Sequence, residues 1–308
     1  MTQNTKIEWC DHTASPWYGC AHVHAGCDHC YAEALAKRSP NTLGVWGNDG
    51  TRVRSRSFLA QLLKWDAAAW RAGKIVNVFP SLCDPFEDRP ELDSWRREMF
   101  DVIDECPNVR LLLLTKRPEN VLRMWPVVSA TDHETTAHFR DNVCLLTSVS
   151  DQTTADALIP DLMKCRDLVP VLGLSCEPLL GPIDIRHWMS GGSSDPSTFV
   201  KLLPCLDWVI VGGESGSQAR PCDVGWMRDL VEQSSAGDVP CFVKQLGSVP
   251  MTTEPSCDAL HWPIEVEFSI TDDGRRRWPR LLSRKGSDTA EWPDELRVRE
   301  FPHSFQEA

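Results

Sequence analysis

Short apolar runs alternate with helix-like stretches through most of this chain, and this rhythm limits its fold more than any other feature. Runs typical of buried strands fall at residues 75–79, 110–114, 143–147, 170–174, 208–211 and 241–243, and an earlier strand is expected at 6–9. Helical patterns fall at residues 28–38, 58–72, 92–105, 154–164 and 224–234. Such alternation is typical of βα units around a parallel sheet. The sequence therefore predicts an α/β fold, a partial TIM-like barrel of six or seven βα units.

The rhythm stops near residue 248 and divides the chain into two parts. We expect residues 1–247 to form the partial barrel, a size that suits the 308-residue chain. Residues 248–308 alternate proline, tryptophan and charge, and are expected to form an appendage packed on the barrel. The stretch SGGSSDPS at residues 190–197 is the best candidate for a mobile surface insertion.

Composition excludes several classes of protein. The chain has 32 basic and 44 acidic residues, a net charge of −12, which argues against a sequence-independent coat for DNA. It contains no apolar run long enough to span a membrane, and its first residues lack the apolar core of a secretion signal. We therefore expect a cytoplasmic protein without membrane contact. The 13 cysteines are then expected to be free thiols and not a disulfide scaffold.

A polar motif follows directly after almost every predicted strand. Because the carboxyl ends of parallel strands lie at one end of a barrel, the loops that follow them meet over a shared mouth. We therefore expect the active-site loops at these strand ends. The charged residues that the motifs contribute are Asp84, Lys116, Asp151, Glu177, Glu214 and Lys244.

Three cysteines within eleven residues give the strongest chemical signal. Cys20, Cys27 and Cys30 have the spacing C-x6-C-x2-C, and glycines precede the first two. Glycine allows a loop to curl so that neighbouring sulfurs can converge. Cys27 and Cys30 are expected one turn apart at the start of a helix, where the helix dipole favours the thiolate.

Three interpretations of this cysteine loop compete. A zinc site would take a fourth ligand from His22, His24 or His29. The last two cysteines could instead form a structural or redox pair. The third interpretation is a [4Fe–4S] cluster held by three thiolates, with one iron open to a ligand. No second C-x2-C occurs downstream, which favours the three-thiolate site over a four-cysteine zinc ribbon.

A three-cysteine loop after the first strand of a partial barrel resembles the radical S-adenosylmethionine superfamily. The final C-x2-C followed by Tyr31 matches that pattern, whereas six residues replace the usual three in the first gap. The chain also resembles a phage- and prophage-associated family of three-Cys-motif proteins. The matching stretches are IEW, GCDHCYAE, LTKRPE, LSCEPLLGPID, DWVIVGGESG, VKQLG and WPDELRVREFP.

The resemblance to the superfamily implies a [4Fe–4S] cluster held by Cys20, Cys27 and Cys30, whose open iron would chelate S-adenosyl-L-methionine. Reduction by an external donor of the flavodoxin or ferredoxin type would then give a 5′-deoxyadenosyl radical. The phage family implies a protein of the bacterial cytoplasm, encoded by a phage or prophage. We expect a nucleobase or nucleotide substrate, as in modification of phage DNA, with a peptide as the alternative.

Residues at the strand ends are the candidates for contacting this cofactor. Glu177 can accept a hydrogen bond from an amino group or a ribose hydroxyl, and nearby serines can bind ribose or a carboxylate. The Gly-Gly-Glu stretch resembles a strand-end turn that lets backbone approach a ligand, although a tight structural turn explains it equally well. The predicted cofactor-binding set is Ser148, Ser175, Glu177, Gly212, Gly213 and Glu214.

Two residues are predicted to act in catalysis. Lys116, with Arg117, directly follows a buried strand and can bind a carboxylate or phosphate; an exposed pair at a helix start is the alternative. Cys176 is a candidate hydrogen-atom donor, and Cys83 and Cys222 are alternatives because they also lie at or near strand ends.

Other charged residues have less specific interpretations. Arg52, Arg54 and Arg56 alternate along the chain, and residues 275–277 are all arginine, so either stretch could bind phosphate or lie in a solvated loop. Asp84 and Glu87 are expected to belong to the acidic start of a helix and not to a metal site.

Two other functions are compatible with the same residues. One is a non-catalytic, zinc-bound partner protein of phage or mobile-element biology. The other is a metal-dependent, nuclease-like enzyme that uses the carboxylates Asp84, Asp151, Glu177 and Glu214.

Overall fold

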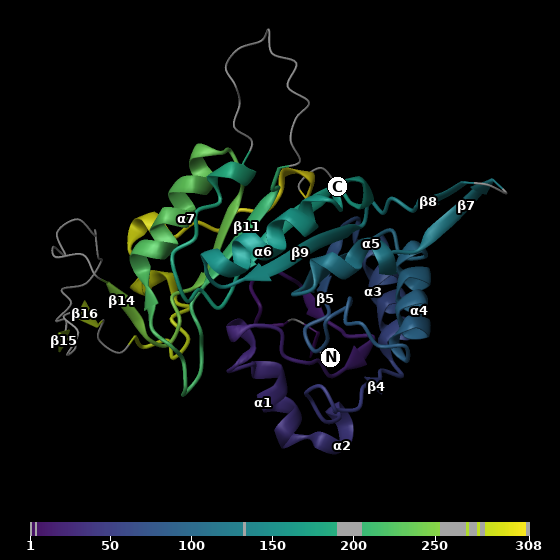
Figure 1. The fold of residues 1–308 in the computed structure, drawn as a ribbon, viewed down its shortest axis with the longest axis horizontal. Coiled ribbons are helices and arrows are strands. Elements are labelled where there is room, and N and C mark those ends of the chain that lie inside the picture. Colours follow the sequence, from purple (N-terminus) through teal and green to yellow (C-terminus); the bar gives the residue numbers. More distant parts are fainter. Residues whose placement is uncertain are drawn as a thin grey trace, which may run out of the picture. The chain divides into compact units, whose positions relative to one another are not determined.

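The computed structural model describes residues 2–3, 5–131, 134–189, 205–252, 269–270, 276–277 and 281–305. The chain has a mixed α/β fold in which a seven-stranded, parallel, curled sheet is flanked by helices (Figure 1). The predicted partial TIM-like barrel is therefore confirmed. The expected insertion at residues 190–197 and the arginine at position 275 lie outside the described residues.

The main sheet has the strand order β1-β2-β5-β6-β9-β10-β11-β13. Its first strand is antiparallel to β2, and the seven strands from β2 onward are parallel. The register places Val76 opposite Val109, Thr115 opposite Thr147, and Cys176 opposite Val211. The bounds are β1 Thr2–Gln3, β2 His12–Thr13, β5 Val76–Phe79, β6 Val109–Thr115, β9 Val143–Val149, β10 Val171–Cys176, β11 Trp208–Gly212 and β13 Cys241–Gln245.

Six of the predicted strands are present, but the strand expected at residues 6–9 is wrong. Residues 8 and 9 form a turn, and the first parallel strand is β2. Trp9 instead packs its ring against Phe79, with ring centroids 4.5 Å apart. Pairing with β5 begins only at Asp11, whose backbone N–H donates to the carbonyl of Asn77 at 2.9 Å. The apolar residues near the start of the chain therefore contribute packing and not a strand.

The longer predicted helices are also present, with small changes at their ends. The helix expected from residue 28 begins only at residue 31, because Cys27 lies in a short 3-10 turn and Cys30 has non-helical backbone angles. The helices are α1 Tyr31–Arg38, α2 Pro40–Leu43, α3 Phe58–Ala72, α4 Leu92–Asp104, α5 Val121–Met124, α6 Gln152–Met163 and α7 Val224–Ala236.

Smaller sheets complete the described part of the chain, and the sequence did not predict them. The pairs β3–β4 and β7–β8 are antiparallel. A further four-stranded sheet has the order β12-β14-β16-β15. The bounds are β3 Trp17–Tyr18, β4 Val53–Arg54, β7 Val127–Thr131, β8 Glu134–Ala137, β12 Cys222–Asp223, β14 Pro250–Thr252, β15 Ser269–Ile270 and β16 Arg276–Arg277.

The chain folds as two compact units. Unit 1 comprises Met1–Thr147, Leu158–Leu172 and Glu307–Ala308, and unit 2 comprises Ser148–Ala157 and Gly173–Gln306. In unit 1 the interior of β6 is completely buried from Leu111 to Leu113, and α3 and α4 lie side by side (Figure 1). A strand buried on both faces reads as a continuous apolar run, which is why β6 was recognisable.

In unit 2 the last residues of the chain pack against the strands β11 and β13. Val243 donates its backbone N–H to the carbonyl of Val298 at 2.9 Å, and Trp208 Nε1 donates to the carbonyl of Glu300, also at 2.9 Å. Helix α7 contacts both of these strands. None of the helices in the described parts of the chain has the length and apolar character that a bilayer crossing requires.

The cap of α7 gives a first test of the fold. Asp223 is buried, and its Oδ1 accepts from the backbone N–H of Gly225 at 2.8 Å. Replacing an N-cap by alanine typically costs about 1 kcal/mol. We expect Asp223→Ala to lower the free energy of unfolding by about 1 kcal/mol in urea titrations, and Asp223→Asn, which keeps the acceptor, to lose less. Equal losses in the two variants would contradict this role.

Candidate functional site

The cysteine loop of unit 1 begins at a fixed point beside the end of β5. Gly19 donates its backbone N–H to the carbonyl of Leu82 at 3.1 Å and forms a parallel bridge with Cys83. The φ angle of Gly19 is +112°, and a Cβ there would lie 2.8 Å from Cδ of Arg52. Only glycine fits this conformation without strain. Cys20 is therefore held next to the segment that follows β5.

The structure describes all three cysteines of the predicted cluster, and none of them forms a disulfide. Cys27 is buried, whereas Cys20 and Cys30 are half-buried. The backbone N–H of Cys30 donates to the carbonyl of Cys27 at 3.2 Å, which keeps these two residues adjacent. Within the described residues no group of three or more His, Cys, Asp or Glu side chains is arranged to hold a metal ion. The three thiols therefore share one loop but do not form a closed metal site.

Two histidines of the loop have structural partners. His22 Nε2 lies 2.8 Å from Oε2 of Glu33, which also pairs with Lys37. His24 Nδ1 accepts from the backbone N–H of Gly26 at 3.1 Å and so caps the 3-10 turn. These contacts engage the ring of His22 and the Nδ1 atom of His24.

Burial is the largest influence on the pKa of Cys20 and of Cys30. It raises the pKa of Cys20 to about 12; the charge of Asp84 acts in the same direction, and Arg117 acts against it. Burial also raises the pKa of Cys30, and the backbone N–H groups of Glu33 and Ala32 offset this only in part. The N–H groups at the helix start therefore favour the Cys30 thiolate, as expected, but burial outweighs them and the pKa rises.

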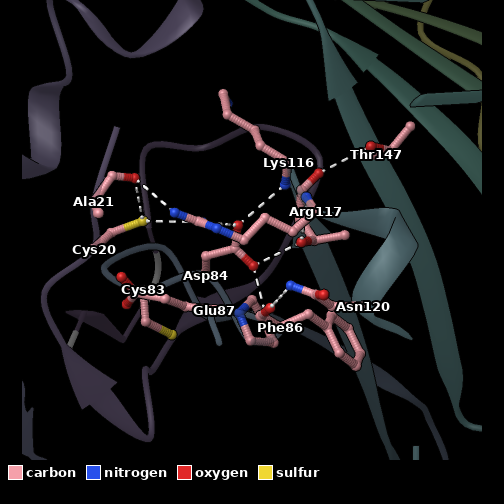
Figure 2. Close-up of polar contacts among 12 residues, drawn as sticks. Cys20, Ala21, Cys83, Asp84, Phe86, Glu87, Lys116, Arg117, Asn120 and Thr147 are labelled. Atoms are coloured by element: carbon pink, nitrogen blue, oxygen red, sulfur yellow. Dashed lines mark hydrogen bonds and ion pairs between the residues drawn. The ribbon is translucent and has the colours of Figure 1, made fainter. Parts of the chain in front are cut away.

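A buried carboxylate links the ends of β5 and β6 (Figure 2). Asp84 Oδ1 accepts from the Thr115 hydroxyl at 2.6 Å and from the backbone N–H of Phe86 at 3.0 Å. Its Oδ2 accepts from Arg117 Nη1 at 2.7 Å and from the backbone N–H of Lys116 at 3.1 Å. Each oxygen thus has two donors, as burial of a carboxylate requires.

The same arginine reaches the cysteine loop. Arg117 Nη1 lies 3.7 Å from Sγ of Cys20, and Nη2 donates to the carbonyl of Ala21 at 2.9 Å (Figure 2). Although burial acts against the charged guanidinium, the neighbouring Asp84 carboxylate raises the pKa of Arg117. The guanidinium therefore stays charged and fastens the cysteine loop to the end of β6.

The sequence missed the role of Asp84. It was expected near a helix start, but α4 begins only at Leu92, and Asp84 and Glu87 are both buried in the loop after β5. The available signal was that an aspartate and the Thr-Lys-Arg motif follow two strands that pair in the sheet. The aspartate and the motif come together because their two strands are neighbours in the sheet, and the order of strands in the sheet could not be predicted from the sequence.

A second buried ion pair holds the segment that contacts the backbone of Cys20. Arg52 Nε donates to Oε2 of Glu87 at 2.7 Å, and its other nitrogens donate to the carbonyls of Gly50 and Gly47 at 3.0 and 3.2 Å. The N–H of Gly47 in turn donates to the carbonyl of Cys20 at 3.0 Å. Because its donors are used inside the protein, the phosphate-binding interpretation of Arg52 is wrong.

In unit 2 the structure gathers most of the predicted cofactor-binding residues around Glu177. Its Oε1 lies 2.8 Å from Nζ of Lys244, and its Oε2 accepts from the Ser175 hydroxyl at 3.4 Å. The Ser148 hydroxyl donates to the backbone carbonyl of Glu177 at 2.9 Å. A Cβ on Gly212 would lie 2.6 Å from Oε1 of Glu177, so this glycine leaves room for the carboxylate.

The other predicted residues of unit 2 are an ion-paired glutamate, a glycine in a tight turn and a buried cysteine. The Glu214 carboxylate accepts from Arg220 Nε at 2.9 Å and Nη2 at 2.7 Å. A Cβ on Gly213 would lie 2.3 Å from the carbonyl oxygen of Leu246, which a tight turn explains. Cys176 is fully buried, and burial raises the pKa of its thiol.

The carboxylates of the nuclease-like alternative are each engaged individually. Asp84 pairs with Arg117, Glu177 with Lys244, and Glu214 with Arg220, while Asp151 accepts from the backbone N–H of Thr154 at the start of α6. A carboxylate that is neutralised by a guanidinium or ammonium group is a poor ligand for a divalent cation. These pairings weigh against a carboxylate metal site at these residues.

The chain belongs to the family described as "Protein of unknown function (DUF5131)", whose family model matches residues 4–288. A search of curated proteins found no match. Similar solved structures include a double mutant of spore photoproduct lyase with bound AdoMet and dinucleoside spore photoproduct, and the lyase complexed with dinucleoside spore photoproduct. Their identity to this chain is 12%, with TM-scores of 0.41 and 0.42 over 91% of this chain and 71% of theirs. At this level of similarity, the activity has to be argued from the residues of this chain.

The two ion pairs of the β4 region give a matched test. The Arg52–Glu87 pair is buried, with 0% and 5% of the side chains exposed, whereas Arg54 and Glu98 pair at the surface with 49% and 39% exposed. Removing one partner of a buried pair typically costs about 3–5 kcal/mol, and a surface pair contributes about 0–1 kcal/mol. We expect Glu87→Gln to lower the free energy of unfolding by about 3–5 kcal/mol. Glu98→Gln should lower it by less than about 1 kcal/mol. Similar losses in both variants would show that Glu87 does not hold the loop.

Proposed function

We propose that this protein is an enzyme that uses a [4Fe–4S] cluster and S-adenosylmethionine, with the cluster held by Cys20, Cys27 and Cys30. The observation that carries the proposal is a loop with three free cysteines that starts at a strand end and is fastened there by Arg117 and Asp84. Thiolates are the usual ligands of iron–sulfur clusters. Three of them leave one iron available to a cofactor.

The donor chemistry of the loop fits such a cluster better than it fits zinc. None of the three cysteines is in a disulfide, while His22 is paired with Glu33 of α1 and the Nδ1 atom of His24 caps the 3-10 turn. When bound, the cluster and S-adenosylmethionine would supply a carbon-centred radical that abstracts a hydrogen atom from the substrate. Cys20 follows a fixed residue, whereas Cys27 and Cys30 lie beyond a short 3-10 turn. Loading therefore requires the loop to bring the three sulfurs together.

The polar residues of unit 2 are proposed to bind S-adenosylmethionine. Glu177 would accept from its amino group or a ribose hydroxyl, with Lys244 and Ser175 holding the carboxylate in place. Ser148 supports the backbone of the same residue. Gly212 supplies the space, and Gly213 and Glu214 continue the turn.

The proposed substrate is a nucleobase or nucleotide, with Lys116 binding its phosphate or carboxylate and Cys176 as the candidate hydrogen donor. Support comes from a cavity of about 550 Å³ in unit 1 lined by Arg54, Arg56 and Trp95 among others. Arginines beside the half-buried ring of Trp95 suit a phosphate with an attached base. The cavity is next to β4, which pairs with β3 directly before the cysteine loop.

Metal analysis tests the cluster. After anaerobic reconstitution, the wild type should contain about four iron and four sulfide with broad absorption near 400 nm. We expect the Cys20/Cys27/Cys30→Ala triple variant to lose both, and Cys10→Ala, which changes a cysteine outside the loop, to keep them. Bound zinc without a cluster would replace this proposal by a zinc-binding protein.

The cofactor site is tested separately by Glu177→Gln. A charge-assisted hydrogen bond is worth about 1.5–3 kcal/mol, so the variant should bind S-adenosylmethionine roughly tenfold or more weakly. Its iron content should be unchanged, because Glu177 is not a cluster ligand. Glu232→Gln, an exposed change on α7, serves as the control for calorimetric titration of the reconstituted protein. Unchanged affinity would remove Glu177 from the site.

A further inference from the structure

We propose that Arg117 is a positioning residue for the Cys20 ligand and that it sets the reduction potential of the cluster held there. Asp84 acts with it as the counter-charge. This inference rests on the proposed function, because it assigns a role toward the cluster that Cys20 would hold.

Arg117 is held so firmly that it cannot turn away from the cysteine. Its side chain is only 12% exposed, and its guanidinium contacts Asp84 Oδ2 at 2.7 Å, Cys20 Sγ at 3.7 Å and the Ala21 carbonyl at 2.9 Å (Figure 2). Asp84 is itself fixed by the hydroxyl of Thr115. Because the guanidinium is planar, these contacts define the direction in which its N–H groups point.

The groups around Cys20 also suit a thiolate. The Cys20 thiol lies 3.3 Å from the carbonyl of its neighbour Ala21 and can donate to it. A thiolate ligand has no proton to donate, but the Ala21 carbonyl still accepts from Arg117 Nη2. The other nitrogen, Nη1, then faces the thiolate and can donate to it.

This placement has an electrostatic consequence for a bound cluster. Reduction adds a negative charge, and hydrogen bonds to the sulfurs together with a nearby positive charge favour the reduced form. Arg117 supplies both. Asp84 accepts from Nη1, the same nitrogen that faces Cys20, and its negative charge acts in the opposite direction. The two residues should therefore shift the potential in opposite senses when each is neutralised, which a purely structural role would not produce.

The test compares midpoint potentials of reconstituted proteins by anaerobic redox titration, after iron and sulfide have been measured. We expect Arg117→Gln to disfavour the reduced cluster about tenfold, which is a shift of about −59 mV for one electron. Asp84→Asn should shift the potential upward, because it leaves the guanidinium without its counter-charge. Arg117→Lys, which keeps the charge, should restore most of the wild-type value.

Arg123→Gln is the matched control, because Arg123 pairs with Asp88 at the surface, and it should leave the potential unchanged. Wild-type protein without a cluster would refute the proposed function itself. A normal cluster whose potential is the same in wild type, Arg117→Gln and Asp84→Asn would overturn only the inference about Arg117. If Arg117→Gln cannot retain iron, Asp84→Asn decides, and a downward or absent shift in that variant overturns the inference.

Discussion

Two carboxylates are buried in the loop that follows β5, and the arrangement of unit 1 depends on how they are neutralised. A buried charge without a partner costs several kcal/mol, so each must be paired and hydrogen-bonded. Asp84 takes Arg117 from the end of β6, and Glu87 takes Arg52 from the segment before β4. Both arginines also donate to backbone carbonyls, so each ion pair fixes a length of loop as well as a charge.

The cysteine loop is held by these pairs and not by its own secondary structure. Gly19 is bridged to the strand-end segment, the carbonyl of Cys20 accepts from Gly47, and the carbonyl of Ala21 accepts from Arg117. Farther along, the loop contains only a 3-10 turn before α1. The first residues of the loop are therefore fixed by contacts outside it, whereas Cys27 lies in the 3-10 turn and Cys30 directly precedes α1.

Unit 2 also has a carboxylate that follows a strand and is paired with a cationic side chain. Glu177 stands at the end of β10 and pairs with Lys244 of β13, and the missing side chain of Gly212 provides the space between them. In each unit, therefore, polar chemistry is concentrated directly after buried strands. Burial of the apolar residues positions each strand in the sheet, and the charged residues follow where the buried segment ends.

The sequence by itself determined most of the strands and helices and identified the loop with three closely spaced cysteines. Continuous apolar runs identified strands such as β6, and helical periodicity identified α3 over its full length, because both signals arise from neighbouring residues. Only the tertiary structure decided the partners of the charged groups. Asp84 and Arg117 are 33 residues apart in the chain, and Arg117 and Cys20 are 97 apart. Strand order and burial bring them together, and burial outweighs the helix start in setting the pKa of Cys30. Long-range pairing and desolvation depend on the whole fold, so no local pattern could specify them.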